Sequence, residues 1–412
     1  MHFLYNNLDI MKKNNTKIKG DYKYINKMLL FMTVFYAIMG VLLILDASSF
    51  SAVLYYKLDT PYYFAIRQFW IVLASLVLSF IIMKIPTTKY KKYSFILSIT
   101  FIGVLLYALT KSSIDSSINE VNLSLAGGRI QPTEFLKVFL IMFMGSYYGE
   151  WANRKKHAPL SFLLPLILCA AAVFVIASGG DYGSAAIMLA LYALVFLRIP
   201  SKEKYIKWIK GVAVCGLIVS VLVLKYAYAI VPKSVLESDP RLLRFMYKNP
   251  CDRYEDSSGY QVCNGYIAID NGGLKGVGIG NSVQKYMYLP ASHTDFIFPI
   301  VVEEFGVIFG IIVLIGYMYI IFLIFRVAMD TVKLQNSLIC YGIAIYITLH
   351  IFVNLGGVLG LIPLTGVPLP FLSYGGSFCM TLICSLGVVQ RIHIENTKER
   401  LQKQIGGESN EE

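Results

Sequence analysis

Residues 299–325 read PIVVEEFGVIFGIIVLIGYMYIIFLIF, and their only charged side chains are those of Glu303 and Glu304. About 20 predominantly apolar residues suffice for a helix to cross the roughly 30 Å hydrocarbon core of a bilayer. Lipid offers no hydrogen-bond partners to an open backbone, so a run of this kind must be helical. We therefore predict a membrane-spanning helix over these residues.

Runs of the same character recur along the 412-residue chain, which is 56% hydrophobic and 15% charged, with a mean hydropathy of +0.61. This composition is atypical of soluble globular domains. It predicts an all-α integral membrane protein with about ten transmembrane helices in a single polytopic membrane domain at 28–391. The runs lie at about 28–47, 65–83, 94–110, 134–149, 159–177, 183–199, 210–231, 299–325, 338–358 and 371–390.

The formal net charge of +12 could suggest a nucleic-acid partner, but the distribution of Lys and Arg follows membrane topology instead. With the N-terminus inside, every short basic segment falls on the same side of the predicted helices. We therefore expect both termini to be cytoplasmic, with a basic segment at 1–27 and a tail at 392–412. A large outer loop is expected at about 232–298, between the seventh and eighth helices.

Two of the seven cysteines, Cys251 and Cys263, fall in the predicted outer loop. The other five lie inside predicted helices, where a small polarizable side chain packs without needing a role. If the outer compartment is oxidising, a bridge between the loop cysteines would close a short loop and stabilise the fold by about 3 kcal/mol. We predict this disulfide.

Residues 272–280, GGLKGVGIG, form a glycine-rich run in the same loop. Glycine permits close backbone approach and positive φ, which suits either a tightly packed re-entrant segment or contact with a lipid pyrophosphate. The run gives only weak support for a dinucleotide site, because that fingerprint needs a βαβ unit that a helical membrane protein does not supply.

Ionisable side chains at membrane depth cost several kcal/mol unless they are paired or face water, so each is a candidate functional residue. In the segment QPTEFLK at 131–137, Glu134 and Lys137 share one helix face. They form either a self-contained ion pair or part of a substrate site. Asp181 lies in an outer turn before the sixth helix, where it can act as an N-cap, as a site residue or as both.

The segment His293-Thr294-Asp295 lies just before the eighth helix, at the predicted outer boundary of the lipid. A partly desolvated carboxylate there could reach both water and a lipid-linked headgroup, which suits a general base. The alternative is that Asp295 only caps the helix. The histidines show no metal-ligand spacing, and no Ser/His/Asp nucleophile arrangement is visible.

Glu303 and Glu304 lie a few residues inside the eighth helix, where adjacent side chains point in different directions. At least one of them is therefore expected to face the bundle interior. Lys137 or Arg129 is the expected neutralising partner.

Together these segments resemble the SEDS family of bacterial shape, elongation, division and sporulation proteins, from the first helix to the last. The resemblance rests on an ordered set of motifs rather than on one. They are QPTEFLK at 131–137, GGLKGVGIG at 272–280 with Gln284-Lys285, Leu289-Pro290, HTDFIF at 293–298, EEFG at 303–306 and PLTGVPLPFLSYGGS at 363–377.

The resemblance implies a peptidoglycan glycosyltransferase in the bacterial cytoplasmic membrane, which polymerises the undecaprenyl-pyrophosphate-linked precursor lipid II on the outer face. It also implies a class B penicillin-binding transpeptidase as partner, within divisome or elongasome assemblies. Asp295 takes the catalytic role. The substrate-binding or supporting candidates are Arg129, Gln131, Glu134, Lys137, Asp181, His293, Thr294, Glu303, Glu304, Ser373 and Ser377.

The mechanism implied is removal of a proton from the acceptor sugar by Asp295 and attack on the donor, with a pyrophosphate leaving group. Lys137, Arg129 or a divalent cation, Mg²⁺ or Mn²⁺, is expected to offset the charge of that group. Where the family commonly has an aromatic-bearing GARRW run and a QPD motif, this chain has Ala126–Arg129 and Gly179–Asp181. These departures concern substrate contacts more than the base.

Two other functions use similar residues. A flippase for lipid-linked oligosaccharides would also need intramembrane acids and a lysine, and it would need polar contacts on both faces. A non-catalytic scaffold would have no reason to gather Asp295, Glu134 and Lys137. The clustering of polar residues at outer helix ends favours chemistry on the outer face.

Overall fold

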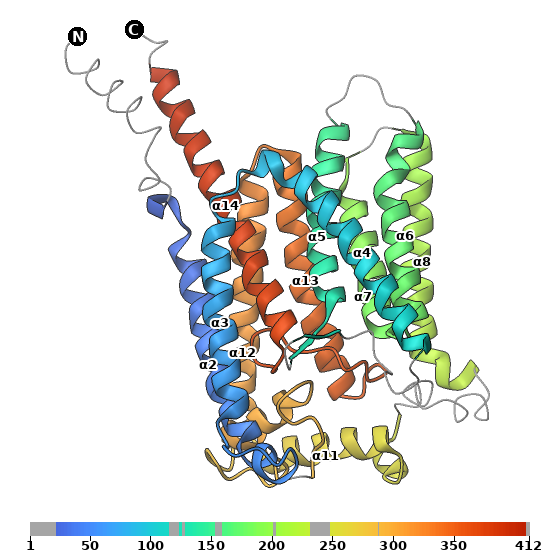
Figure 1. Ribbon diagram of the computed structural model, residues 1–412, viewed down its shortest axis with the longest axis vertical. Helices are drawn as coiled ribbons and strands as arrows, with labels where there is room; N and C mark the ends of the chain where they lie inside the picture. Colours follow the sequence, from blue (N-terminus) through green and yellow to red (C-terminus); the bar gives the residue numbers. More distant parts are fainter. Residues whose placement is uncertain are drawn as a thin grey trace, which may run out of the picture.

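The computed structural model describes residues 22–114, 123–125, 128–152, 159–200, 203–230, 248–286 and 288–408. These residues form a helical bundle with one short antiparallel pair of strands (Figure 1). The helices are α2 (Lys27–Leu54), α3 (Tyr63–Ile82), α4 (Tyr90–Ile114), α5 (Pro132–Ala152), α6 (Leu164–Ser178), α7 (Tyr182–Arg198), α8 (Lys204–Ile230), α11 (Ser257–Gly272), α12 (Ile297–Asp330), α13 (Leu334–Val358) and α14 (Gly376–Glu408). The strands are β1 (Leu123–Leu125) and β2 (Gly128–Ile130), and the short 3-10 helices are η3 (Thr87–Lys89), η4 (Pro159–Leu163) and η5 (Pro250–Arg253).

Each of the predicted apolar runs falls largely within a helix. Among the described residues, 7 helices are long and apolar enough to cross a membrane: α2, α3, α4, α6, α12, α13 and α14. The other runs form α5, which carries Glu134 and Lys137 near its start, the 17-residue α7, and α8. The membrane-spanning helical fold is thus confirmed, while the larger number of spans stays a prediction.

Two of the segments predicted to lie outside the membrane contain helices. Helix α14 continues to Glu408, through most of the predicted tail at 392–412. Glu395 accepts hydrogen bonds from the backbone and side chain of Thr87, and Arg391 lies 2.9 Å from it one turn away. These contacts hold the extension of α14. The predicted outer loop likewise contains η5 and α11, whereas residues 231–247 and 287 lie outside the described part of the chain.

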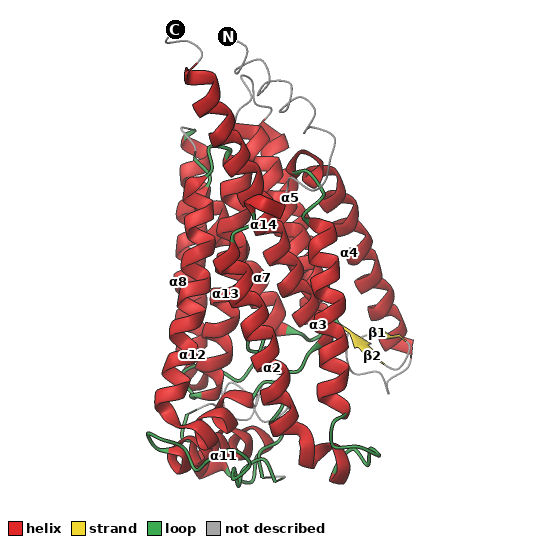
Figure 2. Cartoon of the chain, turned by 90° about the vertical axis from the view of Figure 1, so that its left-hand side faces the viewer, coloured by secondary structure: helices red, strands yellow, loops and turns green. Residues whose placement is uncertain are grey.

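Three described connections that carry lysine, at 22–26, 83–89 and 331–333, meet at one end of the bundle and are called the Lys-rich connections. Asn26, before α2, exchanges two 3.0 Å hydrogen bonds with the Gln390 side chain of α14, so the first and last helices are joined there. Gln335, at the start of α13, donates to the carbonyl of Thr87 in the connection after α3. Helix α11 lies at the opposite end, below α2 and α12 (Figure 2). This separation of basic connections from α11 is the arrangement that the charge pattern predicts.

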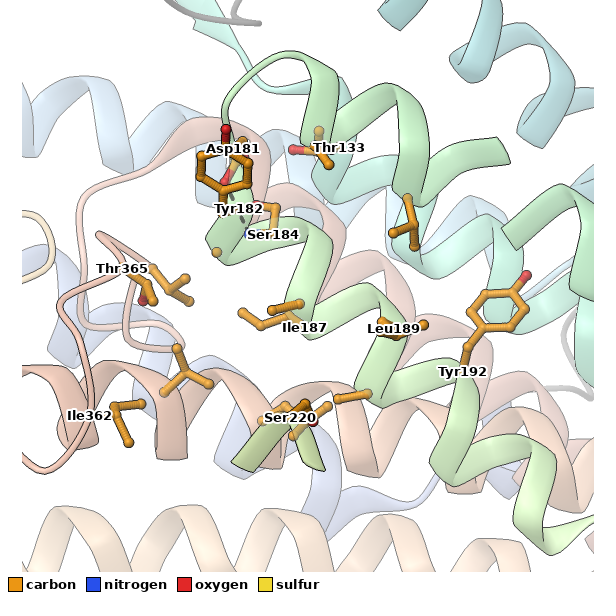
Figure 3. A pocket seen from close by; sticks show the side chains of 18 of the residues that line it. Thr133, Asp181, Tyr182, Ser184, Ile187, Leu189, Tyr192, Ser220, Ile362 and Thr365 are labelled. Carbon is orange, nitrogen blue, oxygen red and sulfur yellow. Dashed lines mark hydrogen bonds between the residues drawn. The ribbon is translucent and has the colours of Figure 1, made fainter. Parts of the chain in front are cut away.

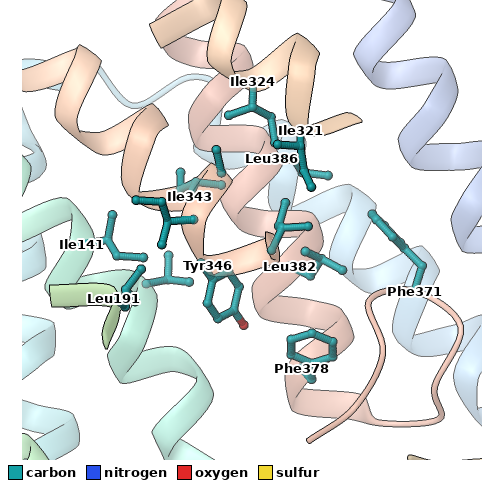
Figure 4. Packing of buried hydrophobic residues seen from close by; sticks show 14 of the residues in the cluster. Ile141, Leu191, Ile321, Ile324, Ile343, Tyr346, Phe371, Phe378, Leu382 and Leu386 are labelled. Carbon is teal, nitrogen blue, oxygen red and sulfur yellow. The ribbon is translucent and has the colours of Figure 1, made fainter. Parts of the chain in front are cut away.

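The core lies where α5, α7, α12, α13 and α14 meet (Figure 4). Lipid is as apolar as these side chains, so the bundle depends on close packing rather than on burial from water. Small residues on α5 permit that packing. A Cβ atom added at Gly145 would lie 2.7 Å from Ile339, and one at Gly149 would lie 2.6 Å from Gln335, both on α13.

Helix α12 is broken at Gly306, where φ is 83° and ψ is 165°. The carbonyls released by the break accept hydrogen bonds from the glycine-rich run: Val277 N donates to Glu303 O at 2.9 Å and Gly278 N donates to Glu304 O at 3.0 Å. In return, Val307 N donates to Gly273 O at 2.9 Å. The run is therefore a packed segment laid against the helix break, as one of the two predicted alternatives requires.

Gly276→Ala tests this packing. Gly276 has φ of +81°, and its added Cβ would lie 2.1 Å from Glu304 O. Gly280 has φ of +83° but open space around the added Cβ, so Gly280→Ala is a control for backbone strain alone. We expect Gly276→Ala to lower the free energy of unfolding by about 1–3 kcal/mol more than the control does, measured by thermal unfolding in detergent. Equal midpoints for the two variants would contradict the close approach.

Candidate active site

A cavity of about 1730 Å³ lies between α6, α7, α8, α13 and the segment 360–368 that follows α13 (Figure 3). Its walls are mainly apolar along α6, α7 and α8, whereas polar side chains gather toward the end where α7 begins. An amphipathic ligand with a long apolar part fits this division. The polar lining includes Gln131, Thr133, Glu134, Asp181, Thr294 and Thr365.

Asp295 lies beside this polar end. Its neighbours Thr294 and Gly366 both line the cavity, and a Cβ added at Gly366 would lie 3.8 Å from Asp295 Oδ2. The carboxylate is half-buried, and its Oδ1 accepts a 2.8 Å hydrogen bond from the Thr294 hydroxyl. The N-cap position of α12 is Phe296 and not Asp295. The carboxylate is thus placed at the edge of the cavity, where a general base would be needed.

Glu134 and Lys137 form a buried ion pair of 2.7 Å. The Tyr346 hydroxyl donates to the other oxygen of Glu134 at 3.1 Å, and His350 Nε2 lies 3.7 Å from that oxygen. Glu134 lines the cavity, whereas the Lys137 side chain is fully buried. The charge of Lys137 is therefore paired with that of Glu134. The prediction that Lys137 neutralises Glu303 or Glu304 is wrong.

Asp181 caps a helix at the edge of the cavity. Its side chain accepts a 2.9 Å hydrogen bond from Ser184 N, which makes it the N-cap of α7 (Figure 3). It also lines the cavity. Capping by a short acid at the positive end of a helix is typical, so the cap fixes a carboxylate at the polar end of the cavity.

His293 is enclosed by aromatic rings. The centroid of its ring lies 4.6 Å from that of Phe64 and 5.9 Å from that of Tyr374, and its carbonyl accepts from Tyr374 N at 2.9 Å. Burial lowers the pKa of His293 to about 4, so the ring is neutral at physiological pH. His293 therefore contributes no charge to the site. Its ring contacts and its carbonyl hydrogen bond position the turn before α12.

Glu303 and Glu304 lie in a separate network. Lys285 Nζ lies 2.6 Å from Glu304 Oε1 and 2.9 Å from Asp46 Oδ1. Lys285, and not Lys137, is therefore the cation that neutralises Glu304. Burial by itself would lower the pKa of Lys285, but its hydrogen bonds to Glu304 and Asp46 outweigh burial and raise it. Glu303 accepts from the Ser282 hydroxyl and from Gln284 N. The two glutamates therefore anchor the segment that leads to Asp295.

Ser373 and Ser377 brace the loop before α14. The Ser373 hydroxyl accepts from Leu369 N at 2.7 Å, and the Ser377 hydroxyl accepts from Gln131 N at 2.9 Å. Ser377 thus ties α14 to the segment that begins α5. Arg129 lies in β2, opposite Ser124, and its side chain is outside the described part of the structure.

The predicted disulfide is present between Cys251 in η5 and Cys263 in α11, with a Cα–Cα distance of 5.0 Å. It joins these elements at the end of the bundle opposite the Lys-rich connections. Among the described residues, no group of three or more His, Cys, Asp or Glu side chains could hold a metal ion by itself.

Several residues at the site are not among the candidate site residues that the sequence predicts. Asn354, on α13, donates to the Asp295 carbonyl, and His350 lies beside Glu134, yet both are single polar residues within an apolar run. Thr365 lines the cavity with a buried hydroxyl that has no partner among the described residues. Lys248 is the only Lys or Arg among the described lining residues. Only the polar character of these residues within apolar surroundings could have singled them out.

Comparison with known proteins agrees with this geometry. A family model described as "Cell cycle protein", covering FtsW, RodA and SpoVE, matches residues 26–398. Relatives named "Probable peptidoglycan glycosyltransferase FtsW" include that of Bacillus subtilis strain 168, 32% identical over 90% of this chain and 92% of its own. The relative of the same name from Enterococcus hirae is 31% identical over 90% of this chain and 92% of its own.

Solved structures share the fold. One, described as "Structural coordination of polymerization and crosslinking by a peptidoglycan synthase complex", aligns with a TM-score of 0.65 at 20% identity, covering 90% of this chain and 98% of its own. The rod shape determining protein RodA of Thermus thermophilus aligns with a TM-score of 0.59 at 19% identity, covering 90% and 96%. With a family match that runs from before α2 into the extension of α14, the chain belongs to the FtsW, RodA and SpoVE family of cell cycle proteins, the SEDS family that its motifs indicate.

Proposed function

We propose that this protein is a membrane-embedded peptidoglycan glycosyltransferase that polymerises lipid II, with Asp295 as general base. The observation that carries the proposal is the position of Asp295, which is half-buried beside two residues that line the polar end of a large apolar cavity, Thr294 and Gly366. The names of its FtsW relatives support the same activity. We propose that the reaction takes place on the outer face of the cytoplasmic membrane. The Lys-rich connections are expected on the cytoplasmic side, and the site lies toward the opposite end of the bundle.

In the proposed reaction, Asp295 takes the proton of the acceptor GlcNAc 4-hydroxyl. The resulting oxygen attacks the anomeric carbon of the donor MurNAc, and the bond to the undecaprenyl pyrophosphate breaks with inversion to a β-1,4 link. The Thr294 hydroxyl donates to one oxygen of this carboxylate and so helps to orient the base. Lys248 at the cavity is the cation that we propose faces the leaving pyrophosphate.

The rest of the cavity fits the other parts of a lipid-linked sugar. Apolar walls on α6, α7 and α8 suit a polyprenyl chain, and the hydroxyls of Thr133 and Thr365 lack partners within the described chain, as groups awaiting a sugar or phosphate would. Gln131, Glu134 and Asp181 complete the proposed headgroup site.

A class B penicillin-binding transpeptidase is the proposed partner, within a divisome or elongasome. A glycan polymerase needs a cross-linking enzyme to consume its product, and the similar solved complex is described as coordinating polymerization with crosslinking. The membrane-spanning count of about ten, with both termini cytoplasmic, is part of the same proposal.

Asp295→Asn tests the base. The change keeps the shape of the side chain and removes its basicity, so we expect lipid II polymerisation by the purified protein in liposomes, with the transpeptidase added, to fall by about 10²–10⁴-fold. Asp330→Asn, at the far end of the same helix, is the matched control and should leave the rate unchanged.

Equal polymerisation by the wild type and Asp295→Asn would show that this carboxylate is not the base. If neither polymerises while labelled lipid II crosses the liposome bilayer, the protein is a flippase. If neither event occurs but the transpeptidase still binds, the protein is a scaffold.

Thr365→Val tests the headgroup site. Valine keeps the shape and removes a hydroxyl that has no partner among the described residues, so folding stability should be unchanged or slightly higher. Loss of one hydrogen bond to substrate should raise the KM for lipid II about fivefold with little change in kcat. Thr331→Val removes another unpartnered buried hydroxyl, which lies between α12 and α13 away from the cavity, and should leave KM unaltered. The same KM for both variants would remove Thr365 from the site.

A further inference from the structure

We propose that Asn354 is a positioning residue that fixes the chain at Asp295 relative to the segment 360–368. The proposal rests on the glycosyltransferase function above. Asn354 Nδ2 donates to the carbonyl of Asp295 at 2.8 Å and to the carbonyl of Val367 at 2.8 Å. One side-chain amide group thus uses both of its hydrogens to join the turn that carries the base to the segment that lines the cavity.

The two joined segments meet at the reacting end of the site. Gly366 and Val367 line the cavity, and Gly366 is the residue whose added Cβ would lie 3.8 Å from Asp295 Oδ2. A shift of either segment would therefore change the distance between the carboxylate and whatever occupies the polar end. A misplacement of about 1 Å can cost about 10²-fold in rate.

The side-chain amide of Asn354 satisfies two backbone carbonyls while its own oxygen stays without a partner among the described residues. Asn354 is only 3% exposed, and its Oδ1 has no hydrogen-bond partner among the described residues. A buried acceptor left unpaired is unfavourable for folding. The amide keeps this orientation because the carbonyls of Asp295 and Val367 need donors. Since the unpaired oxygen is unfavourable for folding, we attribute the residue to the positioning of these two segments.

Asn354 is held on a packed helix, α13. Tyr346, His350 and Asn354 are spaced four residues apart and share one face of the helix. Tyr346 donates to Glu134, and the His350 ring stacks on Phe378 of α14 at 4.4 Å. The same helix face therefore contacts Glu134 at one level and the Asp295 turn at the next. Placement of a site by a packed helix is more precise than placement by loops.

Asn354 itself is not among the residues that line the cavity. Its loss should therefore change the placement of the base and not the binding of substrate. The expected signature is a lower kcat with nearly constant KM for lipid II. A residue that contacts the substrate, such as Thr365, should show the opposite division.

The test compares Asn354→Leu with Asn336→Leu, using the full-length protein in liposomes with its transpeptidase. Asn336 is on the same helix and 1% exposed, and its amide has no partner within the described chain, so the same substitution there removes no contact with the site. We expect Asn354→Leu to lower kcat about 10- to 100-fold with KM within about twofold of wild type. Asn336→Leu should retain the wild-type kcat, and thermal unfolding should confirm that both variants are folded.

A second pair of variants covers failure of Asn354→Leu to fold. Asn354→Ser keeps one hydroxyl donor and Asn354→Ala keeps none, and both are smaller than the native residue. Asn354→Ser should retain several-fold more kcat than Asn354→Ala. The inference is overturned if Asn354→Leu matches Asn336→Leu in kcat, if KM alone rises, or if the Ser and Ala variants are equal. An inactive wild type would instead count against the proposed function.

Discussion

The requirement that every polar group within the membrane has a partner determines much of this structure. Glu134 is paired with Lys137, and Glu304 with Lys285, so each of these two buried acids is neutralised by a buried lysine. The same requirement acts on the backbone. The break in α12 exposes carbonyls that only the glycine-rich run can approach, since a Cβ at Gly276 would lie 2.1 Å from Glu304 O.

These pairings divide the polar residues into two groups with different roles. In the network of Asp46, Lys285 and Glu304, one lysine pairs with two acids and connects α2 to α12. By contrast, Thr365 lines the cavity, and Asp295 lies beside two of its lining residues, Thr294 and Gly366. A buried ion pair by itself is weak support for catalysis, because pairing neutralises its charge. Proximity to the cavity distinguishes the site residues from the structural ones.

The sequence predicts the helices well and the partners poorly. The apolar run at 299–325 lies inside α12 because hydrophobic length is a local property. The proximity of Glu134 and Lys137 follows from their separation, since residues three apart share one face of a helix. Lys285 lies in a loop and contacts Asp46 from a distant helix, so no spacing rule reveals it. Asn354 is similarly hidden, because its role depends on two backbone carbonyls brought together only by the fold.

The hydrogen bonds between Asn26 and Gln390 join the beginning of α2 to α14, and α14 also carries Ser377, which holds Gln131. A chain is synthesised from its N-terminus, and its earlier parts fold first. Until α14 has entered the bilayer, the earlier helices lack both this clasp and the brace at the start of α5. Completion of the cavity is thus tied to α14, which is made after the other described helices, so those earlier helices by themselves cannot hold a finished site.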